Sequence, residues 1–465
     1  MLQPQSLEAP TAMATTVLEH CEVTPPPDAA IEFSLPLVFF DLIWWDFPPN
    51  QSVLFFDFPI SKSRFLDTIV PNLKQSLSLA LKHFLPLAGK IIHPLISGMP
   101  ISLYTIGDSV SLTISESGAD FNNLTGNHQR DSREFYSYVP QLPPATSSSD
   151  SIRVPALALQ VTVFPEHGVC FGFTNHHVIG DASTVVSFIQ SWASINRFNG
   201  DSKYCSLPSF DRTNVQDLNG LDSTYWDLIL KDCDSLEPPL INPPTNKFRA
   251  TFVLREEDVQ KLKKLVLSER KSATHVSSFT VACALVWICL AKSATESGEM
   301  VPDDEVEHFN FVADCRSRLN PPLPATYFGN CVVPVLQAKS SHGKLKGNDG
   351  FFIAAESIGL AIAQTVFNEK GILHDVQNLT AQFQELIGKR QFSVAGSPRF
   401  DFYGVDYGWG RPKKFEALFI DGDGAISFCK SREPEGGLEI GLSRPKISID
   451  SFATTFTEVL GNLIP

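Results

Sequence analysis

The stretch LALQVTVFPEHGVCFGFTNHHVIGDASTVVSFIQSWASI, residues 157–195, decides the fold class of this chain. It contains two apolar runs, 157–164 and 169–174, joined by Pro-Glu-His-Gly, and this pattern predicts a β-hairpin. From about residue 182 to residue 195 the apolar residues recur at helical spacing, which predicts a helix. A hairpin that runs directly into a helix indicates a mixed α/β fold.

His177 and Asp181 lie at the junction between the predicted hairpin and the predicted helix. They form an HxxxD pattern, with Gly180 directly before the aspartate. A neutral imidazole accepts a proton near pH 7, so His177 is suited to deprotonate an alcohol. A structural histidine at the end of a strand satisfies the same pattern. A shared metal site is not expected, because neighbouring side chains such as His176 and His177 point to opposite faces of a strand.

Strand and helix patterns continue on both sides of this stretch. A helix is predicted over 73–84. In the second half of the chain, predicted strands and predicted helices follow one another as well. Between them, from about 199 to 244, the periodicity fades and ends in Glu-Pro-Pro-Leu-Ile-Asn-Pro-Pro, which fits neither helix nor central strand. For the second half we predict helices at 256–267 and 275–291 and a sheet that contains strands 249–254, 309–313, 332–337, 417–420 and 438–440. The predicted units are a disordered leader at 1–16, an N-terminal domain at 17–198, a crossover linker at 199–245 and a C-terminal domain at 246–465.

The composition excludes several classes of protein. The 465 residues carry 37 Lys and Arg against 51 Asp and Glu, a net charge of −14, which disfavours binding to nucleic acid or to an anionic membrane. The chain has nine cysteines, with no CxxC pair and no Cys/His cluster at the spacing of zinc ligands. We therefore expect neither a disulfide framework nor a structural zinc site. No apolar run is long enough to span a bilayer and no secretion signal is visible, so the expected location is the cytosol.

Two further motifs lie in the second half of the chain. Val405–Gly410 reads VDYGWG, and its glycines around a tryptophan predict a tight turn that a buried Trp409 holds. Tyr327–Cys331 reads YFGNC. Each motif on its own has an ordinary structural interpretation.

Together, HxxxD, YFGNC and DYGWG resemble the plant BAHD acyltransferase family, whose hallmarks are HxxxD in mid-chain and DFGWG near the C-terminus. The resemblance extends from Val17 to the end of the chain and includes LALKHFLPLAG at 79–89. Tyr407 replaces the usual phenylalanine. The YFGNC segment is most similar to the clade that acylates anthocyanin, flavonoid and other phenolic glucosides.

The resemblance implies a chloramphenicol-acetyltransferase-like fold of two similar-sized domains, each a mixed sheet covered by helices, with a solvent channel between them. The resemblance also implies that His177 is the catalytic base, which CoA reaches from one end of this channel and the acceptor reaches from the other. The Asp181 carboxylate turns away from the reaction and pairs with an arginine, here Arg316. The remote motif is structural and comprises Asp406, Gly408, Trp409 and Gly410.

The CoA phosphates require cations or other donors in this acidic chain. We predict that Lys271, Thr274, Ser277 and Ser278, near the start of a helix, bind CoA, because a helix N-terminus favours phosphate. The alternative is that Lys271 is a solvated surface charge and that the serines only cap the helix. Ser397 is a candidate hydrogen-bond donor to the oxyanion. We expect no metal and no tightly bound cofactor, with acyl-CoA as a co-substrate.

The predicted activity is transfer of an acyl group from CoA to a sugar hydroxyl of a flavonoid, anthocyanin or phenolic glucoside by direct attack, by a monomer. The segments Tyr327–Cys331 and Ser393–Pro398, with the Asp406 motif, look most like the malonyl-transferring branch of the family. This likeness implies malonyl as the acyl group; hydroxycinnamoyl and acetyl are the alternatives. A non-catalytic small-molecule-binding protein on the same fold would require a lost or blocked histidine. A serine hydrolase would require a GxSxG motif, which the sequence does not contain.

Overall fold

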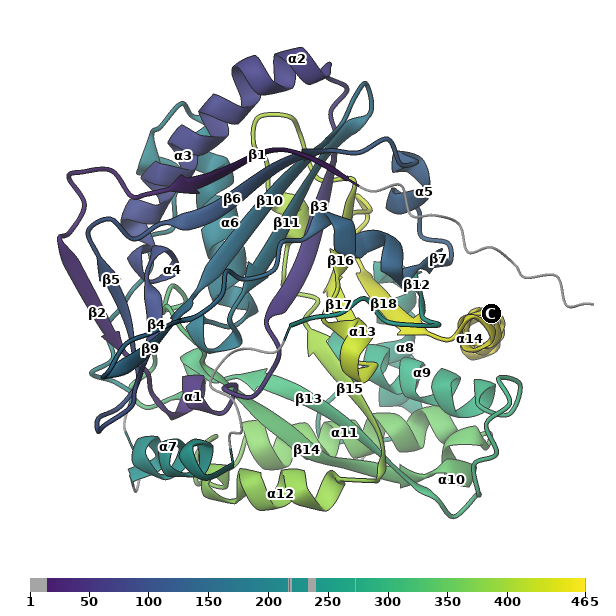
Figure 1. Ribbon diagram of the computed structural model, residues 1–465. Helices are drawn as coiled ribbons and strands as arrows, with labels where there is room; N and C mark the ends of the chain where they lie inside the picture. Colours follow the sequence, from purple (N-terminus) through teal and green to yellow (C-terminus); the bar gives the residue numbers. More distant parts are fainter. Residues whose placement is uncertain (1–14, 216, 218–219, 233–239, 272, 465) are drawn as a thin grey trace, which may run out of the picture.

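The computed structural model describes residues 15–464 except 216, 218–219, 233–239 and 272, and these residues form three β-sheets with helices packed on them (Figure 1). The six-stranded sheet has the order β1 (Thr16–Val23), β6 (Val110–Glu116), β10 (Leu157–Phe164), β11 (Gly168–Asn175), β3 (Asn50–Asp57) and β16 (Lys414–Ala417). The seven-stranded sheet has the order β14 (Val332–Ser341), β13 (Val306–Asp314), β15 (Arg390–Gly396), β17 (Ile426–Lys430), β18 (Leu438–Arg444), β12 (Phe248–Leu254) and β7 (Arg130–Asp131). The five-stranded sheet has the order β2 (Glu32–Pro36), β5 (Ile101–Thr105), β4 (Lys90–Pro94), β9 (Ser151–Pro155) and β8 (Thr146–Ser147).

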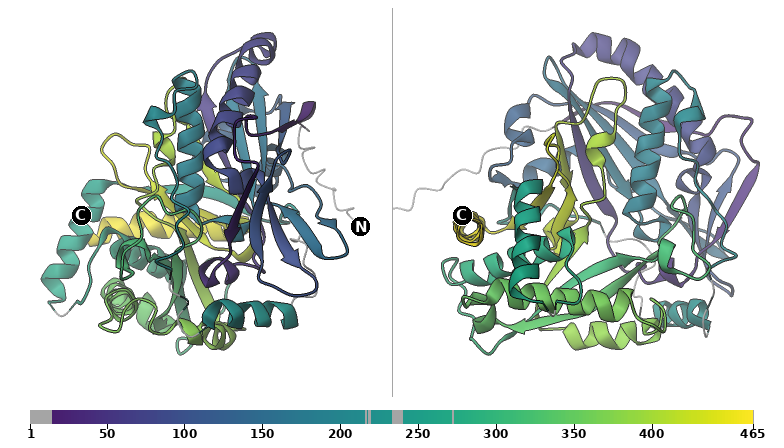
Figure 2. Two further views of the ribbon diagram at one scale, coloured as in Figure 1. Left: turned by 90° about the vertical axis from the view of Figure 1, so that its left-hand side faces the viewer. Right: turned by 180° about the vertical axis from the view of Figure 1, so that it is seen from behind.

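The predicted hairpin and helix are both present. Strands β10 and β11 pair antiparallel from Leu157 opposite Asn175 to Phe164 opposite Gly168. Every residue of the two strands is buried, because helices and loops cover both faces of the sheet. Helix α6 (Ala182–Arg197) follows, and it packs beside α3 (Val70–His83) on one face of the six-stranded sheet (Figure 2). The indole Nε1 of Trp192 in α6 donates to Ser76 Oγ of α3 at 3.1 Å and joins the two helices.

Each half of the chain contributes an edge strand to the sheet of the other half. β16 pairs with β3, and the short strand β7 pairs with β12. The prediction of a strand over 417–420 in the second sheet is therefore wrong. The strand ends at Ala417 and belongs to the first sheet, and a short helix, α13 (Ile420–Asp423), begins at Ile420. Pairing across the two halves depends on contacts that local periodicity does not contain.

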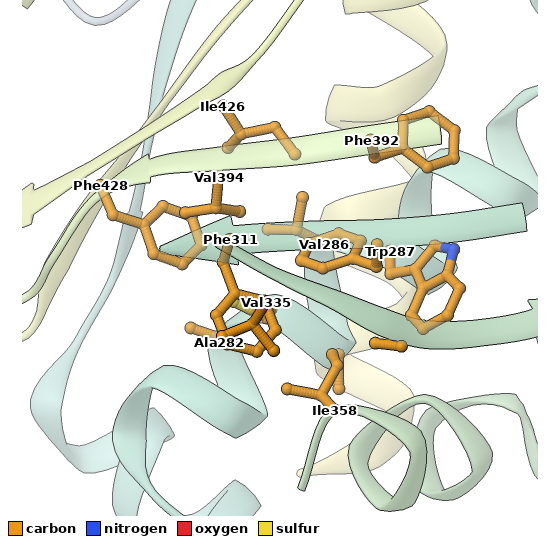
Figure 3. Packing of buried hydrophobic residues seen from close by; sticks show 14 of the residues in the cluster. Ala282, Val286, Trp287, Phe311, Val335, Ile358, Phe392, Val394, Ile426 and Phe428 are labelled. Atoms are coloured by element: carbon orange, nitrogen blue, oxygen red, sulfur yellow. The ribbon is translucent and has the colours of Figure 1, made fainter. Parts of the chain in front are cut away.

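The core of the second half surrounds α9 (Ser278–Ser293), which is buried over most of its length. It lies between the seven-stranded sheet and the helices α8 (Glu256–Glu269), α11 (Gly350–Val366) and α14 (Lys446–Leu463). The indole N–H of its tryptophan is buried but has a partner, because Trp287 Nε1 donates to Glu307 Oε2 at 2.9 Å. Burying each large apolar side chain here contributes about 1.5–3 kcal/mol. Figure 3 shows ten labelled members of this cluster, namely Ala282, Val286, Trp287, Phe311, Val335, Ile358, Phe392, Val394, Ile426 and Phe428.

The predicted leader and linker are only partly described. Residues 1–14 lie outside the described part, and β1 begins at Thr16, the last residue of the predicted leader. The linker region contains a helix that the sequence analysis did not predict, α7 (Leu221–Asp232). The division of the chain at 199–245 stays a prediction. Across the described ranges, no helix combines the length and the hydropathy needed to cross a membrane.

Candidate active site

His177 begins a short 3-10 helix, η3 (His177–Ile179), directly after β11. Its ring stacks on the Trp44 ring, with centroids 4.6 Å apart and planes 9° from parallel, and the Phe47 ring meets it edge-on at 5.8 Å. His176 instead caps η3, since its Nδ1 accepts a hydrogen bond from Val178 N at 3.3 Å. Its ring faces Trp45, at 6.1 Å. The two neighbouring histidines thus contact different tryptophans.

The surroundings of His177 keep its ring neutral. Burial lowers the pKa of His177 to about 4, and the charge of Asp181 acts in the opposite direction. The residue is still partly exposed, whereas its Nδ1 is buried and has no hydrogen-bond partner among the described residues. A neutral, partly accessible imidazole at pH 7 is the form that accepts a proton.

Asp181 turns its carboxylate away from His177. It is the N-cap of α6 and accepts a hydrogen bond from Thr184 N at 3.2 Å. Arg316 Nη1 and Nη2 donate to its two oxygens at 2.8 and 3.0 Å, and Cys331 N donates at 3.0 Å. The pairing with Arg316 that the resemblance implied is therefore present. Gly180 permits this turn, because a Cβ atom there would lie 2.6 Å from Thr184 Cγ2.

The YFGNC segment of the second half holds the His177 turn in place. Asn330 Nδ2 donates to His177 O at 3.0 Å and to Val178 O at 3.2 Å. Thr184 Oγ1 donates to Gly329 O at 3.0 Å and also lies 3.1 Å from Gly329 N. Gly329 has φ of +117°, and a Cβ atom there would lie 2.8 Å from Arg212 Nη2, so only glycine fits without strain.

Asp41 and Arg212 complete this network, and the sequence analysis missed both. Asp41, in α1 (Phe39–Leu42), is fully buried and accepts from Asn330 N at 2.9 Å and from Val38 N at 3.2 Å. Burial raises the pKa of Asp41, and Arg212, whose Nη1 lies 3.2 Å from Oδ2, opposes this rise. A single carboxylate inside the aromatic run FFDLIWW, 39–45, was the signal that could have identified Asp41.

The Asp406 motif forms a closed turn at the far end of α6. Asp406 Oδ1 accepts from Gly408 N at 2.7 Å and from Gly410 N at 3.0 Å, and Arg197 Nη1 donates to Oδ2 at 2.6 Å. Trp409 stacks on Phe58 with centroids 4.6 Å apart. The 16 residues of α6 separate this turn from the His177 turn by about 24 Å along the helix axis. The motif thus contacts the end of α6 that lies away from His177.

The predicted CoA and oxyanion residues lie on two other segments. Lys271 and Thr274 are exposed on the loop between α8 and α9. Ser277 caps α9, since its Oγ accepts from Thr280 N at 3.1 Å, and Ser278 is the first residue of that helix. Ser397 follows β15, and its Oγ accepts from Arg399 N at 3.2 Å. The hydrogen bonds thus join His177, Asp181 and Arg316 in one network. The side-chain hydrogen bonds of Ser277 and Ser397 are local instead, and the backbone N of Ser397 donates to Phe428 O of β17 at 3.0 Å.

Comparison with known proteins adds independent findings. The model of the transferase family matches residues 14–459. Phenolic glucoside malonyltransferase 1 of Nicotiana tabacum is 44% identical over 89% of this chain and 91% of its own length. A malonyl-coenzyme:anthocyanin 5-O-glucoside-6'''-O-malonyltransferase of Salvia splendens is 43% identical over 95% of each chain. The crystal structure of vinorine synthase, 19% identical, superposes with a TM-score of 0.70 over 94% of this chain and 96% of its own, which shows a common two-domain fold.

Proposed function

The chain belongs to the transferase family of BAHD acyltransferases, and from this premise we propose that it transfers a malonyl group from malonyl-CoA to a sugar hydroxyl of a phenolic glucoside. Flavonoid and anthocyanin glucosides are included in this acceptor class. The observation that carries the proposal is the neutral imidazole of His177, held at the start of α6 by groups from both halves of the chain.

The proposed reaction is a direct transfer without an acyl-enzyme. The neutral His177 takes the proton of the acceptor hydroxyl as the oxygen attacks the thioester carbonyl carbon. A C–O bond forms and the carbonyl oxygen becomes an oxyanion, for which Ser397 is our candidate donor. The oxyanion collapses, the C–S bond breaks, and the CoA sulfur receives the proton from the imidazolium. The products are the malonylated glucoside and free CoA, and His177 is neutral again.

CoA binding is proposed at the N-terminus of α9. Lys271 would supply a positive charge, and Thr274, Ser277 and Ser278 would supply hydroxyl or backbone donors. The partial positive charge of the helix end favours the phosphates there. Ser277 Oγ already accepts from Thr280 N, which leaves its hydroxyl proton for a ligand or for Thr280 Oγ1 at 2.9 Å.

The depressed pKa of His177 predicts the pH dependence of turnover. We expect kcat/KM for the glucoside to stay level from pH 8 to well below 6.5, the ordinary histidine value, and to fall only as the pH approaches 4. Unfolding exposes this buried ring, which then takes up a proton below its ordinary pKa. The free energy of unfolding should therefore also fall progressively from about pH 6.5 down to about pH 4. Circular dichroism at each pH separates loss of activity from unfolding. An apparent pKa at or above 6.5 in a folded enzyme contradicts this assignment.

The malonyl donor is tested by competition. With equal malonyl-CoA, acetyl-CoA and coumaroyl-CoA over one phenolic glucoside, we expect the malonyl ester to be the main product. The reason is that the chain is 44% and 43% identical to the two malonyltransferases named above. If the coumaroyl ester dominates by tenfold, about 1.4 kcal/mol in transition-state binding, the donor is wrong while the family assignment stands.

We also propose a cytosolic monomer with domains at 17–198 and 246–465. The eight cysteines in the described part of the chain are all free, which agrees with a reducing compartment. Size-exclusion chromatography with light scattering measures the mass in solution, and a dimer there removes the monomer proposal.

A further inference from the structure

Asp41 is a fully buried carboxylate that none of the reaction steps described above uses. Its Oδ1 accepts from the backbone N and the side-chain Nδ2 of Asn330 at 2.9 and 3.2 Å. Its Oδ2 accepts from Val38 N at 3.2 Å and lies 3.2 Å from Arg212 Nη1. An ionised carboxylate has about four acceptor positions, and four donors occupy them here. Asp41 has none left for a substrate, so its role lies in the groups that it holds.

Asp41 holds two groups that contact His177 from different directions. The Nδ2 of Asn330, which donates to Asp41, also donates to His177 O at 3.0 Å and to Val178 O at 3.2 Å. The main-chain oxygen of Asp41 accepts from Trp44 N at 3.2 Å, and the Trp44 ring stacks on the His177 ring. One residue thus fixes both the turn that carries the base and the ring on which the base lies.

The positive charge beside Asp41 comes from the region predicted as the crossover linker. Ser209 in that region forms a β-bridge with Tyr327, and Phe328 N donates to Ser209 O at 2.9 Å. This pairing places Arg212, three residues further along, between Asp41 and the hydroxyl of Tyr327, to which Arg212 Nη1 donates. The other three donors to Asp41 are neutral amides, so in the described part of the chain Arg212 is the one cation in contact with it.

We propose that Asp41 and Arg212 form a second positioning pair for the base, which sets Asn330 and Trp44 around His177 for proton transfer. This inference rests on the proposed function. A misplacement of about 1 Å can lower the rate of a reaction by roughly a hundredfold. Loss of the pair therefore lowers turnover, although no contact with a substrate is removed.

The pair of Asp181 and Arg316 acts on the same turn from another side. Asp181 caps α6, the helix that begins after the turn. Asp41 instead holds Asn330, whose side chain bonds the carbonyls of the turn itself. The two pairs are thus separate supports, one on each side of the residue that takes the proton.

The first test is Asp41→Asn, which keeps the size of the side chain. In either orientation of the new amide, its NH₂ group faces two donors, which are those of Asn330 or else Val38 N and Arg212 Nη1. We expect kcat to fall by about tenfold to a hundredfold, while the KM values for the glucoside and for malonyl-CoA change less than about twofold. Turnover is measured at a temperature at which circular dichroism shows that the variant is folded.

The matched control is Glu307→Gln, because Glu307 is another fully buried carboxylate with charged or titratable partners. It accepts from Arg390 Nε at 3.0 Å and lies 2.6 Å from His342 Nδ1. The strand from Glu307 to Asp314 spans about 23 Å at about 3.3 Å per residue, which separates Glu307 from Arg316 and the active site. We expect this variant to lose stability, as Asp41→Asn does, and to keep kcat within about twofold of wild type.

The second test asks whether Asp41 acts through Asn330. In an Asn330→Ala enzyme, adding Asp41→Asn should lower kcat much less than it does in wild type, because the two changes break the same connection. A crystal structure of Asp41→Asn gives a readout that needs no substrate. We expect the His177 ring to be displaced there from its parallel stack on Trp44.

The outcomes of these tests are distinguishable. If the wild-type enzyme acylates no glucoside, the proposed function fails, whereas a displaced His177 ring in the variant still supports the positioning role. The inference fails if folded Asp41→Asn keeps the kcat of wild type, or if Glu307→Gln loses as much kcat. It also fails if the effects of Asp41→Asn and Asn330→Ala on kcat simply multiply, or if the His177 ring keeps its place in the variant.

Discussion

Replacement of His177 by alanine is expected to lower turnover by roughly 10²–10⁴-fold, the usual contribution of a general base. The ring is neutral because burial lowers its pKa to about 4, and alanine has no group that takes the acceptor proton. Binding of CoA, measured by calorimetry, should barely change. The melting temperature should stay within about 3 °C of wild type, because the lost contacts are the stacking with Trp44 and the edge contact with Phe47.

The neighbouring histidine provides the matched control. In His176→Asn the new amide oxygen can still accept from Val178 N, so we expect turnover within about threefold of wild type. A His177→Ala enzyme that keeps more than half of wild-type turnover would remove His177 from the mechanism. So would an equal loss in both variants, since His176 faces Trp45 and not the ring of Trp44.

The second large effect is expected on stability, from the buried pair of Asp181 and Arg316. Asp181→Asn and Arg316→Met should each lower the free energy of unfolding by about 3–5 kcal/mol. Arg316→Met leaves the buried Asp181 charge without its partner, and Asp181→Asn leaves the buried Arg316 with only the half-exposed Asp314, 3.0 Å from its Nη1. The double variant should lose much less than the sum of the two single losses. Urea unfolding of the four proteins gives these values. Lys62→Met, which breaks an exposed pair with Glu116, is the control and should cost only about 0–1 kcal/mol.

Turnover in the same series separates positioning from charge relay. If Asp181 only holds the His177 turn through Arg316, turnover should follow stability, and the double variant should be no less active than Asp181→Asn. If Asp181 instead orients the His177 ring directly, adding Arg316→Met cannot restore the turnover that Asp181→Asn has lost. A crystal structure with the Asp181 carboxylate bonded to His177 Nδ1 would also overturn the positioning role.

Short-range patterns predicted much of this protein. The hairpin at 157–174, the helix after it and the HxxxD junction all follow from residues within about 40 positions, where alternation and helical spacing are informative. The resemblance of three motifs then led from Asp181 to Arg316, a partner 135 residues away. It did not lead to the groups that hold the His177 turn from other segments.

The sequence by itself determined the fold class, because alternation and helical spacing are local. It also determined the family and identified His177 as the candidate base, because these depend on motifs and their order along the chain. Only the tertiary structure decided that Asp41, Arg212 and Asn330 support the base. The hydrogen bond between Asn330 N and Asp41 joins residues 289 apart. It likewise decided that β16 and β7 cross between the halves. The physical reason is that buried polar groups choose partners by proximity in the folded chain, and the spacing of residues along the sequence does not encode that proximity.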